Sequence, residues 1–237
     1  MLQILFKNNA WQKPEIVPYK PFQLSPFNQT LHSAMTCFEG MKCYSGIDEK
    51  LRLFRPLKNM ERFKTSMNRL TFDISWDSQE LLNCIIELIK LDKEWVPKNY
   101  GTAMYIRPWA MSMENNLDTI TPNNYGIFCG LSPVGSYFGE IIKPINVMID
   151  TNLPFIRGND KSSASFKLGA NYAPTVLPQK EINQRGFHNI LWTYDGILSE
   201  VGVMNFFVVI INDQGEKEII TPRLDGSILP GITRRSI

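Results

Sequence analysis

Apolar side chains recur at helical spacing in two segments of the chain. Residues three or four positions apart share one face of a helix, so each segment predicts an amphipathic helix packed on a core. The first helix begins after Pro56, and its apolar positions are Leu57, Met60, Phe63, Met67 and Leu70. The second runs from about 78 to 91, with Leu81, Leu82, Ile85, Ile86 and Ile89 on one side.

Runs of β-branched, aromatic and other apolar residues predict strands between and after these helices. The predicted strands cover residues 51–54, 103–109, 125–131, 144–150, 189–194 and 204–211. A third helix is predicted over 171–184, although a proline in a helix interior, here Pro178, costs about 3 kcal/mol unless the helix bends. Turn-forming residues at 132–139 predict a linker between two lobes. Helices and strands that do not strictly alternate indicate a mixed α/β (α+β) fold.

Composition excludes several classes of protein. The 237 residues suffice for one large domain or two small ones, and 43% hydrophobic residues support a sizeable core. The balance of 25 basic against 23 acidic side chains argues against a dedicated nucleic-acid binder. The longest apolar stretch, near 206–211, is far shorter than the ~20 residues that cross a bilayer, and no signal peptide is visible. We therefore expect an intracellular protein that binds neither nucleic acid nor membrane.

The cysteines do not indicate a metal site. Cys37, Cys43, Cys84 and Cys129 form no Cys-x-x-Cys pair, and the chain has 2 histidines. We expect no bound metal, and cysteines that stay reduced and act as small hydrophobic residues of the core.

The strongest candidate for chemistry is a lysine among small residues. Dinucleotide-binding, Walker, zinc-protease and serine-hydrolase motifs are absent from the sequence. Lys167 lies in Ser162-Ser-Ala-Ser-Phe-Lys-Leu-Gly-Ala-Asn-Tyr172, where small neighbours let a bulky ligand approach. A partly desolvated lysine can form a Schiff base with a carbonyl compound such as pyridoxal phosphate. Lys161 is the competing candidate, and an ordinary surface-loop lysine is the alternative interpretation of Lys167.

A pyridoxal phosphate site also needs a carboxylate for the pyridine nitrogen and donors for the phosphate. Glu200, next to an apolar strand, is a candidate for the first role. Arg62 and the backbone of Gly231, Ile232 and Thr233 are candidates for the second. Each also has an ordinary interpretation. Glu200 would be a solvated acid in a turn, Arg62 a solvated arginine on a helix, and the segment 231–233 the start of a helix without a ligand.

Seven blocks in order along the chain resemble the branched-chain amino-acid aminotransferases of the class IV family, in particular those of the eukaryotic type. The blocks are Phe38-Glu-Gly-Met-Lys42, Arg52-Leu-Phe-Arg-Pro56 with Asn59-Met-Glu-Arg62, Met104-Tyr-Ile-Arg-Pro108, Ser132-Pro-Val-Gly-Ser-Tyr-Phe138, Phe166-Lys-Leu-Gly-Ala-Asn-Tyr172, Leu198-Ser-Glu-Val-Gly202 with Met204-Asn205, and Ile228-Leu-Pro-Gly-Ile-Thr233. The resemblance implies a two-lobed class IV aminotransferase fold. It has a small α/β domain at 1–131, an interdomain loop at 132–143 and a large cofactor-binding domain at 144–237 whose pseudobarrel is incomplete.

The resemblance also implies pyridoxal phosphate as cofactor, a homodimer, and roles for individual residues. Lys167 matches the catalytic Schiff-base lysine, Tyr172 the tyrosine at the cofactor's ring oxygen, and Glu200 the partner of the pyridine nitrogen. Arg62, Ile232 and Thr233 match phosphate ligands, whereas Tyr105, Arg107 and Tyr137 match substrate-site residues. An arginine there can bind the glutamate carboxylate while apolar walls hold leucine.

The resemblance predicts a transaminase that moves the amino group of leucine, isoleucine or valine to 2-oxoglutarate, in the cytoplasm or in mitochondria. The chain is expected to lack family segments at both ends. Two alternatives remain open. One is a truncated, inactive family member that serves as an interaction subunit, or an incomplete gene model. The other is a relative with the same fold and different chemistry, such as a D-amino-acid aminotransferase or a lyase.

Overall fold

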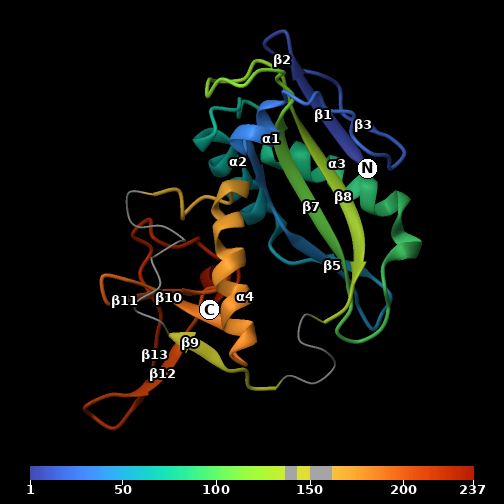
Figure 1. The fold of residues 1–237 in the computed structure, drawn as a ribbon. Coiled ribbons are helices and arrows are strands. Elements are labelled where there is room, and N and C mark those ends of the chain that lie inside the picture. Colours follow the sequence, from blue (N-terminus) through green and yellow to red (C-terminus); the bar gives the residue numbers. More distant parts are fainter. Residues whose placement is uncertain (137–142, 150–161) are drawn as a thin grey trace. The chain divides into compact units, whose positions relative to one another are not determined.

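The structure is a computed structural model that describes residues 1–136, 143–149 and 162–237 (Figure 1). Two compact units make up the chain, Met1–Ile142 and Lys143–Ile237. The division falls inside the predicted interdomain loop 132–143, of which 137–142 lie outside the described residues. Helices and strands are mixed in both units, as the sequence predicts.

The first unit is built on an eight-stranded sheet in which every paired neighbour is antiparallel. The strand order is β2-β1-β8-β7-β5-β6, with β3 also paired to β1 and β4 also paired to β7. The strands are β1 (Leu2–Lys7), β2 (Ala10–Trp11), β3 (Glu15–Ile16), β4 (Thr36–Phe38), β5 (Met41–Ser45), β6 (Leu51–Leu53), β7 (Ala103–Ser112) and β8 (Tyr125–Val134). The two long strands β7 and β8 form the centre of the sheet, and β8 extends three residues beyond its predicted end.

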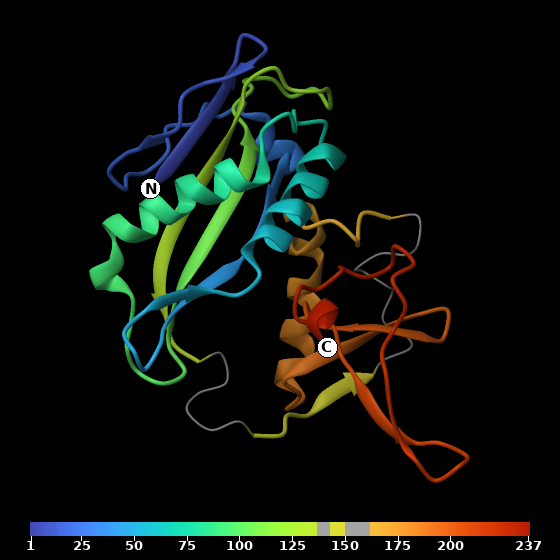
Figure 2. The same cartoon turned by 180° about the vertical axis from the view of Figure 1, so that it is seen from behind.

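Two amphipathic helices, α2 (Pro56–Arg69) and α3 (Ser78–Leu91), cover one face of this sheet (Figure 2). Both predicted helices are confirmed within one residue at their ends. Pro56 occupies the first turn of α2, where a missing N–H costs nothing. Asp77 caps α3, because its Oδ1 accepts from Gln79 N at 2.8 Å and Glu80 N at 3.0 Å. The unit also contains the short helices α1 (Gln29–Ser33) and η1 (Lys93–Trp95).

Seven of the ten apolar positions that predicted the two helices are buried in the core, whereas Leu57 is exposed. Met60, Phe63 and Met67 of α2 and Ile85 of α3 are fully buried. The sheet contributes Leu2, Ile106 and Ile127 from its central strands. All four cysteines are free thiols; Cys37, Cys43 and Cys129 are buried and Cys84 is half-buried. Burial raises the pKa of the Cys129 thiol to about 12, so this cysteine behaves as a small hydrophobic residue.

Strands β4 and β5 follow one continuous register along β7, interrupted between Phe38 and Met41. Phe38 pairs with Trp109 and Met41 with Ile106. Between them, Glu39 N donates to Pro108 O at 2.8 Å. Pro108 has no N–H to return, so the ladder lacks one hydrogen bond there.

The second unit carries a three-stranded sheet in the order β11-β10-β9 and a separate two-stranded ribbon. The strands are β9 (Val147–Ile149), β10 (Asn189–Tyr194), β11 (Ile197–Val201), β12 (Val208–Ile211) and β13 (Lys217–Ile220). Asp195 and Gly196 both have positive φ, 49° and 76°, as a two-residue hairpin turn requires. Helix α4 (Val176–Gln184) places Ile182 in a small core with Ile190 and Trp192.

The predicted third helix begins later than the sequence suggests. Two 3-10 helices, η2 (Gly169–Asn171) and η3 (Ala173–Thr175), precede α4, and the last described turn is η4 (Arg234–Ser236). Pro178 is therefore the third residue of α4. The first amides of a helix have no intrahelical acceptor, so the expected cost of an interior proline is not incurred.

Several sequence expectations for the strands differ from the structure. Strands β1 to β5, β11 and β13 are not predicted from the sequence, and the strands expected over 144–150 and 204–211 begin at Val147 and Val208. No helix within the described ranges is long and apolar enough to cross a membrane. Within the same residues, no three His, Cys, Asp or Glu side chains are grouped in a way that could hold a metal ion.

Candidate active site

Lys167 lies in a short loop that a buried asparagine holds in shape. Asn171 is 8% exposed, and its Nδ2 donates to Ser163 O at 2.8 Å and to Phe166 O at 2.9 Å. Its Oδ1 accepts from Ser163 Oγ at 2.7 Å. These three bonds tie Asn171 back to residues that precede the lysine, so Lys167 lies inside the closed segment 163–171. The local conformation is therefore specified by polar contacts rather than by a regular helix or strand.

The lysine amine contacts a tyrosine five residues along the chain. Lys167 Nζ donates to Tyr172 Oη at 3.2 Å, and both side chains are half-buried. A half-buried lysine in a hydrogen bond differs from a solvated loop lysine, which argues against the ordinary alternative. Amine and phenol within hydrogen-bond reach can exchange a proton, and the amine can attack a carbonyl carbon. The competing Lys161 lies outside the described residues.

Glu200 lies inside β11 rather than in a turn before a strand. The residue is 1% exposed, so the interpretation as a solvated turn acid is wrong. Its Oε1 accepts from Leu229 N at 3.0 Å and from Asn205 Nδ2 at 3.1 Å. A buried carboxylate is costly unless donors compensate the lost hydration, and these two bonds supply part of that compensation.

Asn205 is a structural partner that the sequence did not single out. Its Nδ2 also donates to Leu229 O at 3.0 Å, and its Oδ1 accepts from Gly231 N at 3.1 Å. One amide group therefore joins Glu200 to the turn at 229–231. A polar side chain at the start of the otherwise apolar segment 206–211 was the available signal.

The turn that follows ends in backbone amides without acceptors. Among the described residues, the N–H groups of Ile232 and Thr233 form no hydrogen bond. Ile232 is 8% exposed, and Thr233 is exposed. Successive unpaired N–H groups are suited to an anion such as a phosphate.

Arg62, the predicted phosphate ligand in the first unit, forms a buried ion pair. Its Nε donates to Glu39 Oε1 at 2.6 Å and its second amino group to Glu39 Oε2 at 3.0 Å. The Arg62 side chain is 10% exposed and that of Glu39 is 0% exposed. The interpretation as a solvated helix arginine is therefore wrong.

Tyr105 and Arg107 are neighbours on one face of β7. Arg107 donates to Tyr105 Oη at 2.8 Å. Its guanidinium carbon lies 4.5 Å from the centre of the Phe38 ring and 5.0 Å from that of Tyr105. Attraction between the cation and the two rings fixes an otherwise exposed arginine. Tyr137, the third predicted substrate residue, lies outside the described residues.

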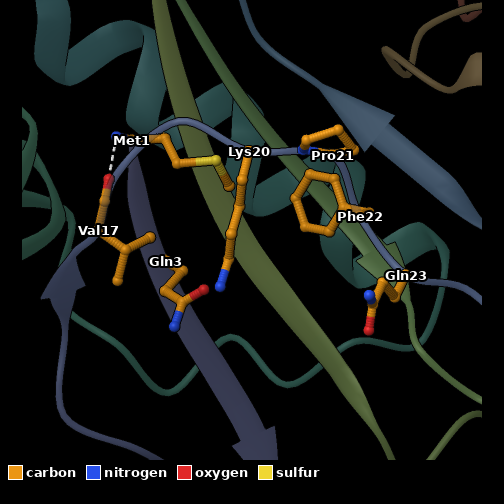
Figure 3. Close-up of a pocket in the computed structure, with 7 residues that line it drawn as sticks. All are labelled: Met1, Gln3, Val17, Lys20, Pro21, Phe22 and Gln23. Atoms are coloured by element: carbon orange, nitrogen blue, oxygen red, sulfur yellow. Dashed lines mark hydrogen bonds between the residues drawn. The ribbon is translucent and has the colours of Figure 1, made fainter.

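Two cavities of the first unit are lined by other residues. The larger, about 270 Å³, is shown in Figure 3 and is lined by Met1, Gln3, Val17, Lys20, Pro21, Phe22 and Gln23. The smaller, about 160 Å³, is lined mainly by apolar side chains and includes Trp76 and Cys84. Neither cavity is lined by a predicted site residue. The candidate site is therefore identified by the chemistry of its side chains and not by a cavity.

Comparison with known proteins gives one consistent family. The family model described as amino-transferase class IV matches residues 36–237. A branched-chain-amino-acid aminotransferase of Dictyostelium discoideum is 42% identical over 98% of this chain and 61% of its own length. The mitochondrial branched-chain-amino-acid aminotransferase of Bos taurus is 43% identical over 98% of this chain and 59% of its own length. The chain thus spans about three-fifths of the curated relatives that it matches.

Solved structures agree on the fold. The branched-chain amino acid aminotransferase of Escherichia coli superposes with a TM-score of 0.76 at 21% identity, covering 100% of this chain and 73% of that one. The corresponding enzyme of Thermobaculum terrenum in its PLP form gives a TM-score of 0.74 at 20% identity, covering 98% of this chain and 71% of that one. The predicted class IV fold is therefore confirmed.

Proposed function

The chain belongs to the class IV aminotransferase family, and from that premise we propose that it is a branched-chain amino-acid aminotransferase. The proposed reaction transfers the amino group of leucine, isoleucine or valine to 2-oxoglutarate. The observation that carries the proposal is the 42–43% identity to relatives so named, over 98% of the chain. The hydrogen-bonded pair of Lys167 and Tyr172 supports it from the geometry.

Pyridoxal phosphate is the cofactor that we propose, and the side chains of the second unit fit it chemically. The group supplies an electron sink for charge at the substrate α-carbon. Glu200, buried and held by two donors, suits the pyridine nitrogen, and the amides of Ile232 and Thr233 suit the phosphate. Arg62 is proposed as a further phosphate ligand.

The proton chemistry falls to Lys167 and Tyr172 in this proposal. Lys167 would hold the cofactor through its amine, and the same Nζ would move the proton at the substrate α-carbon. Tyr172 Oη accepts from that amine at 3.2 Å, so it would orient the amine and could donate to the cofactor's ring oxygen. The proposed reaction needs a lysine that serves the cofactor at one stage and the substrate proton at another. The Tyr172 hydroxyl can both donate and accept a hydrogen bond, so it can stay bonded to the lysine amine at both stages.

Substrate choice is assigned to Tyr105, Arg107 and Tyr137. Arg107 can bind the side-chain carboxylate of glutamate or 2-oxoglutarate, because it is exposed and its guanidinium is held by contacts with two aromatic rings. Apolar substrates do not use that charge. We further propose a homodimer and an intracellular location; the relatives named above include a mitochondrial form, and a cytosolic form is known in Rattus norvegicus.

The test is substitution of the lysine. Lys167→Ala should abolish both the visible absorbance of bound pyridoxal phosphate and the transamination of L-leucine with 2-oxoglutarate. Lys180→Ala, an exposed lysine of α4, is the matched control and should change neither. Intact absorbance and activity in Lys167→Ala would reject the assignment. Turnover of D-alanine in place of L-leucine by the unaltered protein would support the alternative chemistry instead.

A further inference from the structure

Asn205 makes three hydrogen bonds that join two parts of the chain. Its Nδ2 donates to Glu200 Oε1 at 3.1 Å and to Leu229 O at 3.0 Å. Its Oδ1 accepts from Gly231 N at 3.1 Å. An amide group offers two donors and one acceptor atom in a single plane, and here both ends are used.

The same junction is closed by a second route. Leu229 N donates directly to Glu200 Oε1 at 3.0 Å. The carbonyl oxygen of Leu229 accepts from Asn205 Nδ2, so Leu229 is bonded to both side chains. Glu200, Asn205 and Leu229 therefore form a ring of hydrogen bonds. A closed ring restricts the carboxylate more than separate contacts would, because each bond fixes the direction of the next.

The close approach at Gly231 shows how tightly the turn is held. A Cβ atom added to Gly231 would collide with Asn205 Oδ1. Only glycine lets the backbone reach the asparagine at hydrogen-bond distance. The amides of Ile232 and Thr233, which follow at once, take their direction from this anchored residue.

We propose that Asn205 is a positioning residue that fixes the Glu200 carboxylate and the 231–233 backbone amides in one geometry for pyridoxal phosphate. This inference rests on the proposed function. It assumes that Glu200, at one end of the Asn205 amide, contacts the pyridine nitrogen, and that the amides after Gly231, at its other end, bind the phosphate. Asn205 acts through Glu200 and Gly231 and does not itself touch the cofactor. Preorganised groups bind more tightly because their ordering precedes binding.

The experiment measures cofactor affinity without turnover. Pyridoxal phosphate and pyridoxal, which lacks the phosphate, are titrated against the protein and against Asn205→Ala by intrinsic fluorescence. Asn205→Ala should weaken pyridoxal phosphate binding about tenfold or more, the order expected for a lost hydrogen bond to a charged group. The preference for pyridoxal phosphate over pyridoxal should fall as well, because the amides lose their anchor. Asn212→Ala, which removes an acceptor of two backbone amides in the β12–β13 turn, is the matched control and should leave both affinities unchanged.

A second variant reports on the carboxylate. Asn205→Asp keeps an acceptor for Gly231 but places an oxygen against Glu200 Oε1. Two carboxylates at that distance repel, and a shared proton relieves the repulsion, so lower pH favours the pair. The affinity of Asn205→Asp relative to the unaltered protein should therefore be poorest near pH 8.5 and recover towards pH 6.

Each result decides the proposal. Lower thermal stability of the cofactor-free variants with unchanged affinities would overturn it, because Asn205 would then serve the fold alone. If Asn205→Ala does not fold, the pH dependence of Asn205→Asp decides, and a pH-independent ratio overturns the proposal. Failure of the unaltered protein to bind pyridoxal phosphate rejects the proposed function itself, an outcome visible before any variant is compared.

Discussion

Glu39 and Arg62 form a buried, two-point ion pair between the sheet and helix α2. The carboxylate accepts from Arg62 Nε at 2.6 Å and from its second amino group at 3.0 Å. Asn59 Nδ2 and Gly40 N, both at 2.9 Å, add two further donors to Oε2. Arg62 and Asn59 lie three residues apart on α2 and therefore share one helix face, from which both side chains donate to the Glu39 carboxylate.

Glu39→Gln should destabilise the first unit. The substitution removes the carboxylate charge that the buried Arg62 guanidinium contacts, and breaking a buried ion pair from one side typically costs about 3–5 kcal/mol. Denaturant unfolding with and without the substitution measures the loss. Asp48→Asn is the control, since Asp48 makes the same two-point contact with Arg52 on the surface, and it should change stability little. Equal effects of the two variants would mean that burial does not govern the pair.

Glu200→Gln should retain the cofactor and slow proton removal. A neutral amide cannot hold a proton on the pyridine nitrogen, so charge at the α-carbon is less well stabilised. Loss of one key electrostatic partner often reduces kcat by about 100-fold or more. The primary isotope effect with α-deuterated leucine should rise as that step becomes rate-limiting. A change of only a few fold would place Glu200 away from the ring.

Arg107→Leu should separate the two substrate classes. The KM for glutamate or 2-oxoglutarate should rise about tenfold or more, because these substrates lose a hydrogen bond to a charged group. The KM for leucine should change far less. Steady-state kinetics with both amino acids provide the comparison, and equal losses would indicate that Arg107 serves the structure of β7 instead.

Asp225→Asn should lower stability at neutral pH and have no effect in strong acid. Hydrogen bonds from Ser227, with Arg223 nearby, lower the pKa of Asp225 to about 2. The stability that depends on the ionised form is present above the unfolded-state pKa of about 3.9 and is lost as the pH falls through about 2. The group is near the surface, so the effect at pH 6 should stay below about 1 kcal/mol. A difference between the two proteins that is constant from pH 6 to pH 2 would contradict the assignment.

The sequence predicts those elements whose signal is local. Helices α2 and α3 follow from apolar residues at helical spacing, with Pro56 at the start of one and Asp77 before the other. Strand β11 is short and includes Ser199 and Glu200, which are buried through partners elsewhere in the chain, so alternation does not reveal it. The start of α4 is limited by Pro178, which is tolerated only in the first turn of a helix. The spacing of apolar residues does not reveal that limit.

The candidate site follows the same division. Lys167 and Tyr172 are five residues apart, and one sequence block contains both. Asn205 carried no assigned role because its partners include Leu229 and Gly231, 24 and 26 residues away. A side chain whose task is to join distant turns becomes recognisable only when the fold brings those turns together.

Phe38 and Glu39, adjacent residues opposite Trp109 and Pro108 of β7, contact different arginines. Neighbouring residues of an extended chain point to opposite faces, so Phe38 lies against exposed Arg107 while Glu39 reaches buried Arg62. Inserting or deleting one residue here would exchange the partners, with the carboxylate facing Arg107 and an aromatic ring facing Arg62. The length of this short connection is therefore constrained as well as its residue types, because an insertion or deletion would disturb both arginine contacts at once.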